Sequence, residues 1–154
     1  MANTIEQGND LMIFIKKSGD TTPTAIACAT NHTLTVSTET SDTSHKDIVG
    51  KWKSSAVKSF SWEISTENLF TLDGTGNDYA DLFDAMVAGT ELTVAFGLKS
   101  GSTVPSTGWT MDSAKDSYTG NVIITSLTLN APNGDNATYS ATFTGVGQLT
   151  HTAV

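Results

Sequence analysis

Apolar and polar residues alternate along most of the chain with a period of two, the pattern of a half-buried β-strand. The stretch KSFSWEIS places Phe60, Trp62 and Ile64 on one side of such a strand, with serines and a glutamate between them. Similar alternation occurs in ELTVAFGLK, NVIITSLTLN and ATYSATFTGVG. The pattern predicts about seven or eight strands. The turn residues APNGDN predict a β-hairpin that joins residues 127–130 to residues 137–143.

One stretch, NDYADLFDAMVAG, departs from this alternation and has the period of an amphipathic helix. Asn77 is the expected N-cap and Gly89 the expected terminator of a helix at about residues 77–88. Five apolar side chains on one stripe of this helix are predicted to form a helix–sheet core: Tyr79, Leu82, Phe83, Met86 and Val87. We interpret the helix as a structural plug on a sheet, with a partner-binding helix as the alternative.

The chain is expected to form a single domain over residues 1–154, mainly β, as a β-sandwich or partial barrel with one flanking helix. Two segments without a regular pattern, at about residues 40–56 and 100–120, are expected to be long loops. Loops of this length in a compact domain are usually functional or ordered by a partner. Each contains a tryptophan, Trp52 or Trp109, and the alternative is a loop folded back over its own core.

The distribution of charge points to the first of these loops. The formal net charge is −8 and all eight basic residues are lysines, a poor composition for tight binding of nucleic acid. Residues 46–58 nevertheless hold four lysines and one aspartate, a charge of +3, which leaves −11 for the remainder. Apolar anchors in such a basic loop are typical of a protein contact. The expected contact residues are Lys46, Ile48, Val49, Lys51, Trp52 and Lys53.

The sequence contains no recognisable catalytic or nucleotide-binding motif, so neither an enzyme nor a bound cofactor is expected. The run Asp73–Asp78 has oxygen-bearing side chains at a calcium-loop spacing, but it lacks the required glycine, and a helix-capping turn accounts for the same residues. No run approaches the ~20 apolar residues of a membrane helix, so no membrane partner is expected. The single cysteine and the polar N-terminal residues, which do not resemble a secretion signal, favour synthesis in the cytoplasm.

The central third of the chain, Lys46 to Gly97, resembles the major tail tube proteins of long-tailed bacteriophages. The resemblance rests on the order of its features: a loop leading into the Trp62 strand, the acidic TEN at residues 66–68, the helix YADLFDAMVAG, and the strand ELTVAFG directly after it. It implies a structural subunit that forms hexameric rings, which stack into a hollow conduit. It also implies that DNA passes through the lumen without specific binding and that the basic loop contacts the adjoining ring.

The resemblance further implies a protein of the virion tail that is made in the cytoplasm of the bacterial host. Tape-measure proteins and tail-terminator or tail-tip proteins would be its partners. An acidic lumen would let the phosphate backbone of DNA slide past. Four acidic residues in or beside predicted strands are candidates to line it: Glu39, Glu63, Glu67 and Glu91. The alternative function is a carbohydrate-binding β-sandwich with Trp52, Trp109 and Tyr118 as an aromatic platform.

Overall fold

A computed structural model describes residues 4–17, 20–47, 50, 52–72, 77–101 and 108–154. These residues form one sheet of seven strands and one helix. The elements in chain order are β1 (Leu11–Lys16), β2 (Thr24–Ala25), β3 (Ala29–Asp42), β4 (Ser55–Leu69), α1 (Tyr79–Ala88), β5 (Leu92–Leu98), β6 (Ser117–Asn130) and β7 (Thr138–Thr152). The strand order is β2-β1-β5-β6-β7-β4-β3, and all neighbouring strands are antiparallel. The predicted class, mainly β with one helix, is confirmed.

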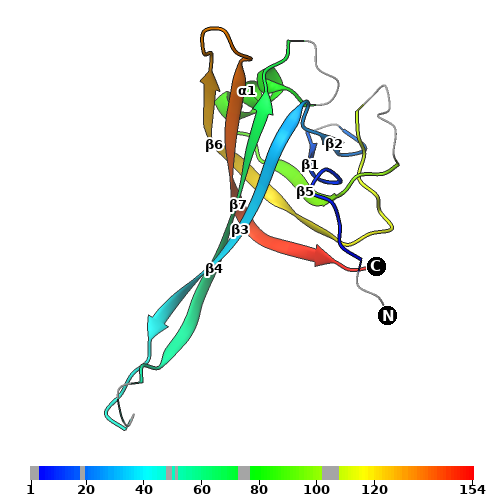
Figure 1. Ribbon diagram of the computed structural model, residues 1–154. Helices are drawn as coiled ribbons and strands as arrows, with labels where there is room; N and C mark the ends of the chain where they lie inside the picture. The colour runs from blue at the N-terminus through cyan, green and yellow to red at the C-terminus, as the bar shows by residue number, and fades with distance from the viewer. Residues whose placement is uncertain (1–3, 18–19, 48–49, 51, 73–76, 102–107) are drawn as a thin grey trace.

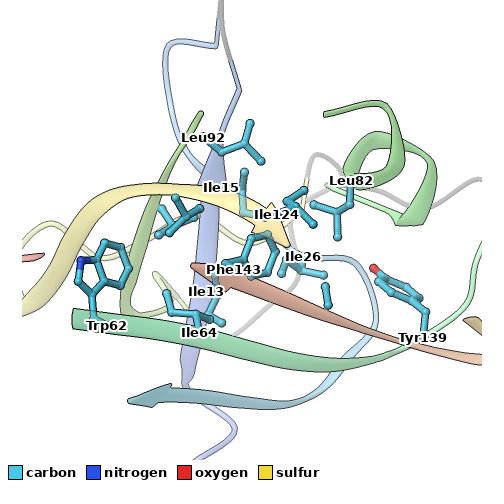
Figure 2. Packing of buried hydrophobic residues seen from close by; sticks show 13 residues of the cluster. Ile13, Ile15, Ile26, Trp62, Ile64, Leu82, Leu92, Ile124, Tyr139 and Phe143 are labelled. Atoms are coloured by element: carbon cyan, nitrogen blue, oxygen red, sulfur yellow. The ribbon is translucent and has the colours of Figure 1, made fainter. Parts of the chain in front are cut away.

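The sheet curves strongly enough for strands from distant parts of it to share one core (Figure 1). Ile13 and Ile15 of β1 belong to the same buried cluster as Trp62 and Ile64 of β4 and Phe143 of β7 (Figure 2). Each pair of buried residues is separated by one residue that points to the other side of its strand, as the period of two requires. The result is a partial barrel whose edge strands are β2 and β3.

A second, smaller cluster covers the opposite side of β1 and β5. It is made of Phe14, Ala25, Ala95, Met12, Trp109 and Met111. The β5–β6 connection is tied to the sheet here, because the Ala25 backbone N–H donates to the Trp109 carbonyl over 3.1 Å. The predicted loop at 100–120 is therefore too long, since β6 begins at Ser117. Its described part around Trp109 folds back over the core, which is the alternative that the sequence analysis gave for these loops.

The β3–β4 hairpin extends further than the sequence pattern suggested. The ladder continues to the pair Asp42 and Ser55, so the predicted loop at 40–56 is shortened at both ends. Polar residues alternate with few apolar ones in these strand ends, so they lack the pattern that marks a half-buried strand. The predicted β6–β7 hairpin is confirmed, because Asn130 pairs with Thr138 and Leu129 with Tyr139.

The N-cap of helix α1 lies one residue later than predicted, and the helix begins at Tyr79, two residues after the predicted start. Its N-cap is Asp78, which forms a capping box with Asp81, and Gly89 ends the helix in the left-handed conformation as expected. Asn77, the predicted N-cap, is buried instead. Its side-chain amide donates to the backbone carbonyls of Ile15 and Thr24 over 3.3 and 3.0 Å, which fastens the helix entry to the sheet.

The predicted helix–sheet core is only partly correct. Leu82 is buried in the main cluster, and Tyr79 packs against that cluster with its ring edge-on to Tyr139. Phe83, Met86 and Val87 are 48%, 36% and 72% exposed, so the prediction was wrong for these three residues. The helix sits at one end of the partial barrel and does not lie flat along a sheet face (Figure 1). Its contact line is consequently narrow, which leaves the rest of the apolar stripe uncovered.

Candidate assembly surfaces

One side of the β7–β4–β3 part of the sheet is polar and faces away from the core. Strand pairing places Thr35, Glu63 and Thr144 in one row across this side, because directly paired residues share a face. Most other positions carry hydroxyls. We call this side the polar face, which consists of Thr33, Thr35, Ser37, Glu39, Ser61, Glu63, Ser65, Glu67, Ser140, Thr142 and Thr144.

Three of the four candidate lumen acids lie on the polar face. Glu63 and Glu67 are exposed side chains of β4. Glu39 lies on the same side of β3, where the Lys58 ammonium contacts its carboxylate at 3.0 Å. Glu91 lies elsewhere, in the short connection between α1 and β5. The structure therefore brings Glu39, Glu63 and Glu67 onto one surface and separates Glu91 from them.

The end of the β3–β4 hairpin projects from the body as an arm (Figure 1). We define the arm as residues 36–42 and 55–61 with the described residues of their connection. The pairing of β4 with β7 stops at Glu63 opposite Thr144, so beyond this point no strand of the described residues pairs with the hairpin. All residues of 36–42 and 55–61 are exposed. Each strand of the projecting part has seven residues, so six steps of about 3.3 Å give it a length of roughly 20 Å before the connection.

The arm has one apolar side, which the spacing of its apolar residues along the sequence does not predict. Val57 and Phe60 are three residues apart, which in a regular strand would place them on opposite sides. A β-bulge at Lys58 corrects the spacing, because Thr40 pairs with Val57 after a shift of register. Val36, Val57 and Phe60 therefore share one side of the arm, where they are 57%, 58% and 72% exposed.

The predicted contact residues belong to the connection at the far end of the arm. Trp52 is 85% exposed, and Lys46 and Lys53 are also exposed. Neither lysine takes part in an ion pair between described residues. The other three predicted contact residues lie outside the described part of the chain: Ile48, Val49 and Lys51. Sequence reasoning did not identify Val57 as a surface residue. It placed Phe60 on the same side of its strand as Trp62, and the register agrees, although Phe60 is exposed.

Polar groups are also buried on the core side of β3, β4 and β7. The His32 ring, the Asn68 amide oxygen and the Tyr139 hydroxyl are buried without a hydrogen-bond partner among the described residues. Burial lowers the pKa of His32 to about 4. Burial, assisted by the negative charge of Asp78, raises the pKa of Tyr139 above its usual value. These groups form no recognisable catalytic arrangement.

The described residues carry neither a metal-binding cluster nor a membrane-spanning helix. That part of the chain holds no group of three or more histidine, cysteine or acidic side chains placed to bind a metal ion. Residues 73–76 of the calcium-like run lie outside it, and the last residue of the run, Asp78, is the helix N-cap. Within the same residues, no helix has the length and apolar character needed to cross a membrane.

The three aromatic residues of the alternative carbohydrate platform have separate environments. Trp52 is at the far end of the arm, whereas Trp109 packs in the second cluster with the Lys99 ammonium 4.4 Å from its ring centre. Tyr118 of β6 stacks on His151 of β7 with a distance of 5.0 Å between ring centres. The described structure thus offers no common face for these rings.

Comparisons with known proteins agree with this architecture. No curated protein matches the sequence. Among solved structures, the chain is similar to a protein in the C6-symmetric tail of an empty GTA particle, with a TM-score of 0.74 and 20% identity over 97% of this chain and 100% of that one. A chain from the virion of a native gene transfer agent gives a TM-score of 0.72 at 19% identity, over 97% of this chain and 100% of that one.

A third structure, the SPP1 tail tube, matches with a TM-score of 0.68 and 9% identity over 96% of this chain and 79% of that chain. At such low identities these likenesses concern the fold. A family profile described as phage tail tube protein matches residues 5–151, which is nearly the whole sequence. The curved sheet, the projecting hairpin and this match lead to one conclusion: the chain belongs to the phage tail tube protein family.

Proposed function

We propose that this chain is the repeating subunit of a hollow tail tube in which hexameric rings stack along one axis. The observation that carries the proposal is a pair of free strand edges on the ribbon β6-β7-β4-β3. Among the described residues, β3 pairs with β4 alone along its 14 residues. The pairing of β6 with β5 stops at Val122, so residues 123–130 also have one edge that no described strand pairs with.

Long free edges expose backbone donors and acceptors that readily pair with another chain. The two edges lie on opposite sides of the ribbon, so β3 of one copy is suited to pair with β6 of the next. A contact between two different surfaces of identical copies closes into a ring when the rotation fits. The C6 symmetry of the similar GTA tail supports six copies as the size of that ring.

In such a ring the polar face lines the channel. Its hydroxyls and the carboxylates of Glu63 and Glu67 give a wetted, negatively charged wall. The phosphate backbone of DNA is repelled by such a wall and finds no arginine to bind it. DNA therefore passes without specific binding, and the protein acts as a structural part with no catalytic step.

Stacking is the role we assign to the far end of the arm. Trp52 supplies an apolar anchor, and Lys46 and Lys53 supply positive charge toward the acidic body of the adjoining ring. The remaining predicted contact residues, Ile48, Val49 and Lys51, are assigned the same role. The protein is made in the cytoplasm of the bacterial host and enters the virion tail, with a tape-measure protein and tail-terminator or tail-tip proteins as its other partners.

Electron microscopy of concentrated protein combined with amide hydrogen exchange tests the proposal. We expect rings of six copies around a channel. Compared with dilute monomer, amides of β3 and of residues 123–130 should exchange more slowly in the rings. The matched control is β5, which is already paired with β1 and β6 and should not change. Failure to form rings, or rings in which β3 exchanges as it does in the monomer, would contradict the proposed joint.

A further inference from the structure

The outward side of α1 carries apolar groups that no described part of the chain covers. Phe83 and Val87 are one turn apart and therefore face the same way, with Met86 beside them. Asp84 is exposed on the same helix, and Glu91 follows directly after it. Neither acid takes part in an ion pair between described residues. We call this surface, residues 83, 84, 86, 87 and 91, the α1 face.

An apolar centre flanked by charges is the composition of an interaction site. Residues 78–91 contain four acidic residues and no basic one, a formal charge of −4, of which the Lys17 ammonium offsets one by its contact with Asp81 at 3.1 Å. The partner of such a surface should therefore present exposed apolar side chains together with positive charge.

The arm presents that complementary surface. The exposed indole of Trp52 lies at its far end, and Val57 lies on the apolar side of the strand that follows. Lys46 and Lys53 are near the same end, within the connection 43–54 that has a formal charge of +2, whereas Lys58 of the arm pairs with Glu39 nearer the body. The far end of the arm and the α1 face thus both expose apolar groups, are opposite in charge, and are not covered by any described residue of the same copy.

Their positions exclude a contact within one copy. The arm leaves the body at one end, and α1 lies at the other end (Figure 1). Two copies stacked end to end bring the arm of one to the α1 end of the next. A contact of this kind, repeated between identical copies without closure, produces an open stack.

We propose that the arm of one copy docks on the α1 face of a second copy in the adjoining ring. Trp52 at the far end of the arm packs against Phe83, Met86 and Val87, and Lys46 and Lys53 lie beside Asp84 and Glu91. The inference rests on the proposed tube function and adds the acceptor surface to it. It also gives the exposed part of the helical stripe a role in assembly.

A charge exchange between Lys53 and Asp84 tests this pairing. Lys53→Glu and Asp84→Lys should each leave ring formation intact. Each should raise the protein concentration needed for tubes about tenfold or more, because the small loss of charge attraction at one contact is repeated in every subunit of the ring. The double variant restores opposite charges and should form tubes near the wild-type concentration. Sedimentation velocity reports rings, and electron microscopy reports tubes.

Glu6→Lys is the matched control. Glu6 is exposed in the N-terminal segment, and this change raises the formal net charge from −8 to −6, the same change that Asp84→Lys makes. The control variant should form tubes like the wild type. Equal loss of tubes in both variants would mean that net charge decides stacking, which would overturn the inference.

Apolar variants test the centre of the contact. Trp52→Ser and Val87→Ser change exposed side chains, so both should keep the fold and the rings while losing tubes. Ile5→Ser, a change at a residue that is 89% exposed, should have no effect. Tubes that form normally from the Asp84 and Val87 variants would overturn the α1 contact alone. Wild-type protein that forms neither rings nor tubes would overturn the proposed function and this inference with it.

Discussion

The indole of Trp62 lies against two glycines on neighbouring strands, and this contact offers a sharp test of the core. A Cβ atom on Gly145 would be 2.2 Å from Trp62 Cε2, and one on Gly120 would be 2.5 Å from Cζ2. Both distances are far below van der Waals contact. Gly145→Ala must therefore displace an indole that is 6% exposed and donates its Nε1–H to the Gly147 carbonyl over 3.0 Å.

The cost of that displacement follows from what the indole loses. Overpacking a core costs about 1–3 kcal/mol, and loss of a buried large aromatic side chain costs about 3–5 kcal/mol. The hydrogen bond adds about 1 kcal/mol. We expect Gly145→Ala to lower the free energy of unfolding by about 3–5 kcal/mol. At about 2–4 °C per kcal/mol for a chain of this size, Tm should fall by roughly 6–20 °C.

Thermal and urea unfolding followed by circular dichroism measure the effect. Dilute protein is needed, because assembly stabilises the native state by mass action. Gly8→Ala is the control, since a Cβ there meets no atom within 4 Å and should change stability by less than about 0.5 kcal/mol. In a Trp62→Val background the clash is absent, so Gly145→Ala should cost little. An equal cost in both backgrounds would refute the proposed contact.

Three further predictions concern the helix and a buried histidine. Leu82→Ala should reduce the free energy of unfolding by about 2–5 kcal/mol, whereas Val87→Ala should change it by about 0.5 kcal/mol or less, as urea unfolding would show. Asp78→Ala removes the capping box and should cost about 0.5–2 kcal/mol in the same assay; no change would contradict its capping role. The folded-state pKa of His32 is about 4, below the 6.5 of the unfolded chain, so the unfolded state binds the proton first and stability falls as pH drops from 6.5 toward 4. His32→Gln should flatten that part of the stability–pH curve, by up to about 3 kcal/mol between its ends, and an unchanged slope would contradict the assignment.

The sequence alone was sufficient for the local elements and for their order. Alternation identified the strand around Trp62 and Ile64, and turn residues identified the β6–β7 hairpin. Helical spacing and Gly89 located α1 to within about two residues. These features depend on backbone preference and on which side of an element is apolar, both of which are local properties of the chain.

Residues with the same local pattern nevertheless differ in burial. Phe60 and Trp62 both lie on the apolar side of β4, but Trp62 is buried and Phe60 is exposed. The difference arises because β7 accompanies β4 only as far as Glu63, a length that is set by pairing between residues about 80 positions apart. A period of two specifies the side of a strand that is apolar, and it carries no information on whether another strand covers that side.

In the helix, too, the sequence shows which residues are apolar but not which of them are buried. Its stripe of Tyr79, Leu82, Phe83, Met86 and Val87 is visible in the sequence, but only the tertiary structure decided which of them the barrel end covers. The polar face likewise required the strand order, since Glu39, Glu63 and Glu67 come together through pairing of β3 with β4. Spacing along the chain thus determined which residues form strands and the helix. Whether a given side chain is buried or exposed depended on pairing between distant strands, because a side chain is covered only where a neighbouring strand runs alongside.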